Sequence, residues 1–195
     1  MKKSLFLKIF SGYLVIASLI SAILLIFSFN IAKTFYINSL KNDFQNIGNV
    51  LAVDLSEPIK NRNISMLNLN VSNLGRKTGR RITIVDAKGM VMSDSESDAS
   101  HMENHLNRPE FKQALLGETG SSVRFSATLK TDMLYVAVPV REKQTITGAV
   151  RVSLSLSEIN HLLAAFRKTT FKLIGLMMFL LLAAAYTFSK SITGP

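Results

Sequence analysis

The chain has 195 residues, a formal net charge of +10 and no cysteine. This length accommodates one domain of ordinary size together with two membrane spans. The lack of cysteine excludes disulfides and any metal site or nucleophile that needs a thiolate. The sequence contains no nucleophile elbow and no phosphate-binding glycine loop, so we expect no catalytic residue and no bound cofactor in this chain. Its basic residues are scattered, which predicts a solvated basic surface and no nucleic-acid partner.

An uncharged run at residues 9–32 lies between Lys8 and Lys33 and is long enough to cross a bilayer as a helix. A cleaved signal peptide is the alternative interpretation. We favour an uncleaved span, because the run exceeds a typical signal-peptide core and no small-residue cleavage site follows it. The lysines in residues 1–8 then place the N-terminus in the cytoplasm by the positive-inside rule.

Residues 33–172 are expected outside the cytoplasm and open with a continuing helix. Its apolar stripe could pack on its own domain or on a second copy, and consists of Leu40, Phe44, Ile47, Leu51 and Leu55. Pro58 is expected to end or kink this helix. A second helix is predicted for residues 64–74, with Gly75 as its stop.

The apolar period then changes from helical to alternating. Strands are predicted at residues 81–86, 90–93 and 120–128, with two more between residues 131 and 156. A short helix at residues 108–116 separates them, opened by a capping box between Asn107 and Glu110 and closed at Gly117. This order predicts an α+β domain with an antiparallel sheet of about five strands and helices grouped on one side.

The last predicted strand alternates from Ile146 to Leu156, with one apolar face on a core and one polar face toward water. Gly148 on the apolar face leaves room for a close approach to the sheet, so we take it as a candidate pocket floor. Arg151 and Ser153 belong to the polar face.

A helix follows this strand without a linker and runs into a second apolar segment, residues 173–189. Ser155 and Glu158 have the spacing of a capping box at the start of this helix. We therefore interpret Ser155, Glu158 and Ile159 as the residues that couple the sheet to a second span.

Two strand arginines, Arg124 and Arg151, could line a pocket for a carboxylate or a phosphate, because guanidinium pairs with both in a bidentate manner. Tyr135 and His105 would join this pocket if their side chains converge on it. The alternative is a salt-bridged or solvated outer face of the sheet. We favour this alternative because surface charges of this kind contribute little free energy. His101 and His105 have a usable metal spacing, but the polar loop around them favours no metal site.

Several segments occur in an order that resembles one family. They are residues 78–86 (TGRRITIVD), 102–110 (MENHLNRPE), 114–117 (ALLG) with Gly120, 133–137 (MLYVA) and the strand 148–156. Together they resemble the extracytoplasmic PAS-like (single Cache) domain of sensor histidine kinases of the phosphate-regulon type. Residues 191–195 resemble the start of a HAMP linker, whose first helix opens at a proline such as Pro195.

The resemblance implies a two-pass protein of the bacterial inner membrane, with both termini in the cytoplasm and a HAMP start at residues 190–195. It implies a homodimer in the lipid bilayer that receives a signal from the envelope or from a transporter-associated partner. It also implies that a kinase region using ATP and Mg follows Pro195 and serves a cognate response regulator. The same input module could instead serve a chemoreceptor or a cyclic-nucleotide signalling protein, or act as a non-catalytic bitopic interaction protein.

Overall fold

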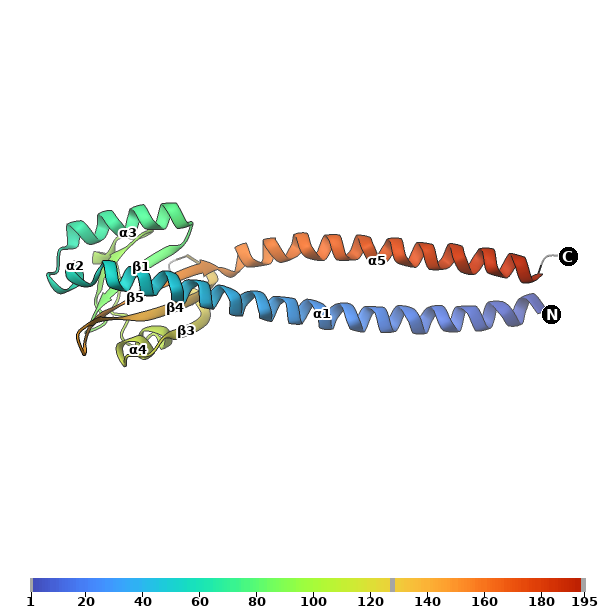
Figure 1. The fold of residues 1–195 in the computed structure, drawn as a ribbon, viewed down its shortest axis with the longest axis horizontal. Coiled ribbons are helices and arrows are strands. Elements are labelled where there is room, and N and C mark those ends of the chain that lie inside the picture. The colour runs from blue at the N-terminus through green and yellow to red at the C-terminus, as the bar shows by residue number, and fades with distance from the viewer. Residues whose placement is uncertain (1, 127–128, 194–195) are drawn as a thin grey trace. The chain divides into compact units, whose positions relative to one another are not determined.

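The computed structural model describes residues 2–126 and 129–193, and the chain divides into two compact units. One unit comprises residues 1–37 and 161–195, and the other comprises residues 38–160. The elements in chain order are α1 (Lys2–Asp54), α2 (Ser56–Lys60), α3 (Ile64–Thr78), β1 (Arg81–Asp86), β2 (Val91–Asp94), the 3-10 helix η1 (Ala99–His101), α4 (Pro109–Leu115), β3 (Gly120–Ser126), β4 (Thr131–Glu142), β5 (Thr145–Ser155) and α5 (Leu156–Thr193) (Figure 1).

The first unit is built from the beginning of α1 and most of α5. Among the described residues, one helical stretch is long and apolar enough to cross a membrane, and it lies in α1. The second predicted span, residues 173–189, lies within α5, although several of its side chains fall outside the described part of the chain. That span stays a prediction.

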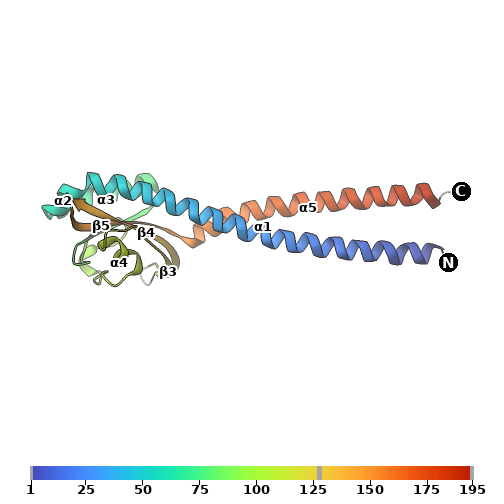
Figure 2. The same cartoon turned by 60° about the horizontal axis from the view of Figure 1, so that its bottom comes forward.

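The second unit is organised around one sheet of five antiparallel strands in the order β2-β1-β5-β4-β3. The predicted α+β class and strand count are confirmed. The predicted grouping of helices on one side is wrong, because α2 and α3 lie on one side of the sheet and α4 lies on the other (Figure 2). A strand pattern tells which residues share a face, but it does not tell what covers that face.

The α1 stripe packs on the sheet of its own chain. Leu40, Phe44, Leu51 and Leu55 are all buried. Gly48 brings the helix so close that a Cβ there would lie 2.9 Å from Val138 of β4. The stripe is therefore part of the domain core, so of the two alternatives the structure shows packing on its own domain and not an exposed interface for a second copy.

The second predicted helix is longer than expected. It continues past Gly75 to Thr78 and ends at Gly79, whose φ of 62° is the left-handed conformation that closes many helices. Gly75 has a packing role instead, because a Cβ there would lie 2.6 Å from the Cβ of Ser95. Pro58 does not end the first helix, which stops at Asp54, and lies within α2.

The polar face of β5 is buried, and the predicted exposure to water is wrong. Arg151 is 2% exposed, and Ser153 and Ala149 are fully buried. Helix α4 covers this face, where Phe111 and Ala114 form a cluster with apolar residues of β1, β4 and β5. The strand ends at Ser155, and Leu156 already belongs to α5.

Candidate functional site

Helix α4 delivers the central group of the site, the Glu110 carboxylate. The helix opens with Arg108 as an extended N-cap and Pro109 in its first turn, and no side chain caps it. The predicted capping box between Asn107 and Glu110 is therefore wrong. Glu110 lies one turn before Ala114, so it shares the covered face of the helix and points at the sheet.

The carboxylate of Glu110 is completely buried and accepts three hydrogen bonds. Its Oε2 accepts from Ser122 Oγ at 2.6 Å, and its Oε1 accepts from Arg124 Nη2 at 2.8 Å and from Arg151 Nη1 at 3.0 Å. Burial by itself raises the pKa of Glu110, but the hydrogen bonds from Arg124 and Ser122 and the charge of Arg151 outweigh it and lower the pKa from 4.5 to about 2. Glu110 is therefore ionised throughout the physiological range.

Aromatic rings enclose the two guanidinium groups. The Arg151 guanidinium carbon lies 4.8 Å from the centre of the Phe111 ring and 4.6 Å from that of Tyr135. Arg124 lies 4.2 Å from the Tyr135 ring. These are cation–π distances, so the rings stabilise charges that burial removes from water.

The polar network continues across the sheet beyond Arg151. Arg151 Nη2 donates to Thr83 Oγ1 at 3.0 Å, and that hydroxyl donates to Asp94 Oδ2 at 2.6 Å. Arg81 Nε completes the chain with hydrogen bonds of 3.1 Å to Asp94. The strand register explains this order, because Thr83 is paired with Arg151 on one side and with Asp94 on the other. Charges of alternating sign thus join β3 to β2 beneath α4.

Gly120 allows the close approach of α4 to the sheet. A Cβ at this position would lie 2.1 Å from the Glu110 carbonyl oxygen, which is far inside van der Waals contact. Any other residue at the start of β3 would push the helix and its carboxylate away from Arg124.

His105 lies in the segment that leads into α4, and it is half-buried 5.9 Å from the Phe111 ring. Its backbone N–H donates to the Gly89 carbonyl at 2.8 Å, which fastens the segment to the β1–β2 turn. Burial, together with the charges of Arg151, Arg108 and Arg124, lowers the pKa of His105 from 6.5 to about 4. The ring is therefore neutral at pH 7, and its buried Nδ1 has no hydrogen-bond partner among the described residues.

His101 does not join His105 in a site. It is exposed and lies 3.2 Å from Asp98. Within the described residues, no three histidine or acidic side chains gather closely enough to hold a metal ion.

Of the residues predicted for a ligand pocket, the structure brings Arg124, Tyr135, Arg151 and His105 together next to α4. Gly148 lies elsewhere, beside Ile59 of α2, where a Cβ would be 2.3 Å from the Val85 carbonyl oxygen. The close approach expected at Gly148 is thus made by the chain itself.

Sequence reasoning missed Glu110 as a site residue, along with Ser122, Thr83 and Asp94. One signal was available for Glu110. It lies next to Phe111 and one turn before Ala114, whose apolar side chains indicate the buried face of the helix, and a buried carboxylate requires a cationic partner.

The predicted coupling residues lie where β5 meets α5. Ser155 Oγ accepts a hydrogen bond from the Ser157 N–H at 3.1 Å, so it caps α5 through the second helical residue. Ile159 is fully buried. The side chain of Glu158 and the whole of Pro195 lie outside the described residues.

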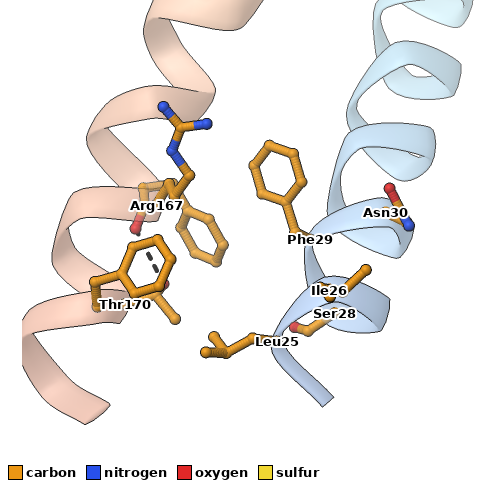
Figure 3. A pocket seen from close by; sticks show the side chains of 9 residues that line it. Leu25, Ile26, Ser28, Phe29, Asn30, Arg167 and Thr170 are labelled. Atoms are coloured by element: carbon orange, nitrogen blue, oxygen red, sulfur yellow. Dashed lines mark hydrogen bonds between the residues drawn. The ribbon is translucent and has the colours of Figure 1, made fainter. Parts of the chain in front are cut away.

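A separate hollow of about 190 Å³ lies in the first unit, between α1 and α5. Leu25 and Phe29 reach into it from α1, while Asn30 points away (Figure 3). On the α5 side, Thr170 Oγ1 donates to the Phe166 carbonyl at 3.0 Å. The lining of the hollow is mainly apolar and includes one charged residue, Arg167. We therefore assign the hollow no chemical role.

Comparisons with known proteins bear on the fold of this domain. Residues 60–155 match the family model described as Single Cache-like. The domain has a Cache fold. The PAS-like architecture predicted from the sequence is thereby confirmed, and this sensor-domain fold is shared by histidine kinases and chemoreceptors. A comparison with curated proteins finds no match.

Three solved structures illustrate the likeness. The V. cholerae histidine kinase DctB sensor domain has a TM-score of 0.59 and 20% identity, with 69% of this chain and 56% of that chain covered. The E. coli DcuS sensor domain has a TM-score of 0.55 and 18% identity, with 64% and 95% covered. The ligand-binding domain of the Campylobacter jejuni chemoreceptor Tlp3, in complex with 4-methylisoleucine, has a TM-score of 0.57 and 11% identity, with 67% and 57% covered. Because this chain spans little more than half of the DctB and Tlp3 domains and the identities are low, the likeness establishes the fold alone.

Proposed function

We propose that this chain is the input module of a membrane-bound sensor histidine kinase of the phosphate-regulon type. In this proposal, residues 33–172 lie outside the bacterial inner membrane between spans at residues 9–32 and 173–189. One observation carries the proposal. Strand β5 holds Arg151 at the centre of the buried charge network, and its last residue, Ser155, is followed directly by the first residue of α5.

In this proposal, the network is the two-state element. Arg124 and Arg151 donate to the Glu110 carboxylate of α4, Tyr135 lies against both guanidinium groups, and His105 lies in the segment before α4. A signal that moves α4 or the His105 segment therefore changes the partners of a strand arginine. Such a signal must favour one of the two states, and couplings of this kind are typically worth about 1–3 kcal/mol. The change then reaches α5 through the end of β5.

In the same proposal, Ser155, Glu158 and Ile159 pass the change into the second span and on to a HAMP linker at Pro195. The kinase region after Pro195 uses ATP and Mg, works as a homodimer and phosphorylates a cognate response regulator. The signal comes from an envelope or transporter-associated partner.

A chemoreceptor input is the second candidate, because the Tlp3 ligand-binding domain has the same fold. The sequence after Pro195 distinguishes the two outputs. A helix with a phosphoacceptor histidine supports the kinase, and a long heptad-repeat bundle supports the chemoreceptor.

The coupling can be tested with residues 1–195 joined at Pro195 to the HAMP and kinase region of a characterised sensor kinase. Ser122→Ala serves as an internal stimulus, because it removes one hydrogen bond from Glu110. We expect Ser122→Ala to change the rate of histidine phosphorylation in membranes. Asn160→Pro should abolish this response, since proline inside a helix removes a backbone hydrogen bond and costs about 3 kcal/mol.

Asn160→Ala is the matched control, because it changes the same exposed residue and keeps the helix intact. The response to Ser122→Ala should persist in this control. An equal response in the proline and alanine variants would overturn transmission through α5.

A further inference from the structure

The groups around Glu110 form a recognition site for a carboxylate. Two guanidinium groups and one hydroxyl donate to its oxygens, and Phe111 and Tyr135 wall the site. Guanidinium groups are among the charged donors with which proteins bind free carboxylates. Here the carboxylate belongs to the same chain.

We propose that Glu110 is the built-in ligand of this Cache site. The domain is thereby held in its occupied state without any soluble ligand, and an input acts by withdrawing α4 rather than by filling an empty pocket. The withdrawal of α4 by an input rests on the proposed function, whereas the occupancy of the site by Glu110 does not.

Charge explains why the site stays occupied. The Arg151 side chain is 3% exposed and the Arg124 side chain is 21% exposed, so withdrawal of Glu110 would leave two poorly hydrated cations side by side. Uncompensated buried charge is strongly unfavourable. A tethered group also acts at a high effective concentration, commonly millimolar or above, and a soluble carboxylate has to compete with it.

Geometry explains why Glu110 can nevertheless be displaced. The Nε atoms of Arg124 and Arg151 are buried and have no hydrogen-bond partner among the described residues. A carboxylate that paired with each arginine through Nε and Nη would satisfy them, but Glu110 reaches only one Nη of each. The built-in ligand therefore leaves donors unsatisfied, and a state without it loses less than a fully paired site would.

Removal of the side chain followed by chemical rescue tests this proposal. Glu110→Ala deletes the carboxylate and its adjoining carbon, which are the atoms that acetate supplies. The full chain in detergent is unfolded thermally in increasing sodium acetate, with sodium chloride and neutral acetamide as references. We expect Glu110→Ala to have a lower Tm than the wild type, and acetate to raise that Tm saturably by several degrees beyond the chloride effect. Acetamide should not raise it.

Two matched variants isolate the site. Glu103→Ala removes an exposed glutamate from the preceding segment and should respond to acetate only as to chloride. Adding Arg124→Gln to Glu110→Ala should abolish the rescue. Wild-type protein should show no specific response to acetate, because its site is filled.

Three results would overturn the proposal. One is a folded Glu110→Ala protein that responds to acetate only as to chloride, and another is a variant that stays unfolded in both salts. The third is measured on the wild type, and it is a saturable stabilisation by acetate beyond the chloride effect that Arg124→Gln removes. Every measurement here is the thermal unfolding of a chain that carries no kinase region. Failure of the built-in-ligand proposal is therefore distinguishable from failure of the signalling proposal.

Discussion

At the scale of single residues, Arg151 and Glu110 define each other's environment. Burial lowers the pKa of Arg151, and the nearby Glu110 carboxylate opposes that shift. Loss of one partner from a buried pair costs about 3–5 kcal/mol, whereas replacing the entire pair with apolar groups is often neutral. The pair therefore adds little net stability but imposes one arrangement of α4 on the sheet.

His105 gives the domain a separate sensitivity to acid. Its pKa is about 4 in the folded chain and 6.5 as the ordinary value, so an unfolded chain binds a proton first as the pH falls. The stability that the neutral ring allows is present above about pH 6.5 and is lost as the pH falls toward 4. The Glu110 carboxylate matters only at lower pH, because its contribution to stability is lost as the pH falls from its ordinary pKa of 4.5 to about 2.

We predict that His105→Phe reduces the loss of stability between pH 7 and pH 5. Urea unfolding of the full chain at both pH values measures this, since Glu110 stays ionised across that range. His101→Phe is the control, because it replaces an exposed histidine beside Asp98, and we expect a smaller effect from it than from His105→Phe. Equal pH dependence in wild type and His105→Phe would contradict the role assigned to the buried ring.

At the scale of elements, the contact between α4 and β3 fixes the site. Helix α4 has seven residues, too few to be stable alone, so its position depends on packing. Gly120 is the point of closest approach, directly against the Glu110 backbone.

Gly120→Ala should destabilise the domain by about 1–3 kcal/mol, the usual range for overpacking a core. It should also raise the accessibility of the site to acetate, because the displaced helix withdraws its carboxylate. Thermal unfolding with and without acetate measures both effects. Ser121→Ala, at the exposed neighbouring position, should change neither.

Elements with a strong local period were predictable from the sequence. The strand at residues 81–86 and the short helix before Gly117 both follow from patterns that a few neighbours complete. The buried face of β5 did not follow, because the covering helix comes from a different part of the chain. Glu110 was misassigned for the same reason. A capping box is a local pattern, whereas the ion pair with Arg151 joins residues 41 positions apart.

Helix ends show a further limit of prediction. Gly75 and Gly79 are both suitable stops by composition, and only the packing against Ser95 explains why Gly75 is needed inside α3. The chain uses the second glycine, which adopts the left-handed conformation.

At the scale of the whole molecule, the polar network ties the two edges of the sheet into one unit. It passes from Arg124 on β3 through Glu110 and Arg151 to Asp94 on β2. A change at any member therefore alters the pairing of strand β5, which leads to α5. Under the proposed function, signals received at different places on the domain would all reach α5 through the end of β5.

Because α5 follows β5 directly, the end of the strand fixes the direction in which each residue of α5 faces around the helix axis. Each residue added to a helix turns everything after it by about 100°, and seven residues make about two turns. We predict that one or two alanines inserted after Asn160 disturb phosphorylation in the kinase fusion, while seven largely restore it. A steady decline with insert length, or indifference to it, would contradict this periodicity. The junction would then transmit an angle, and the identity of individual side chains beyond it would matter less than the direction in which they face.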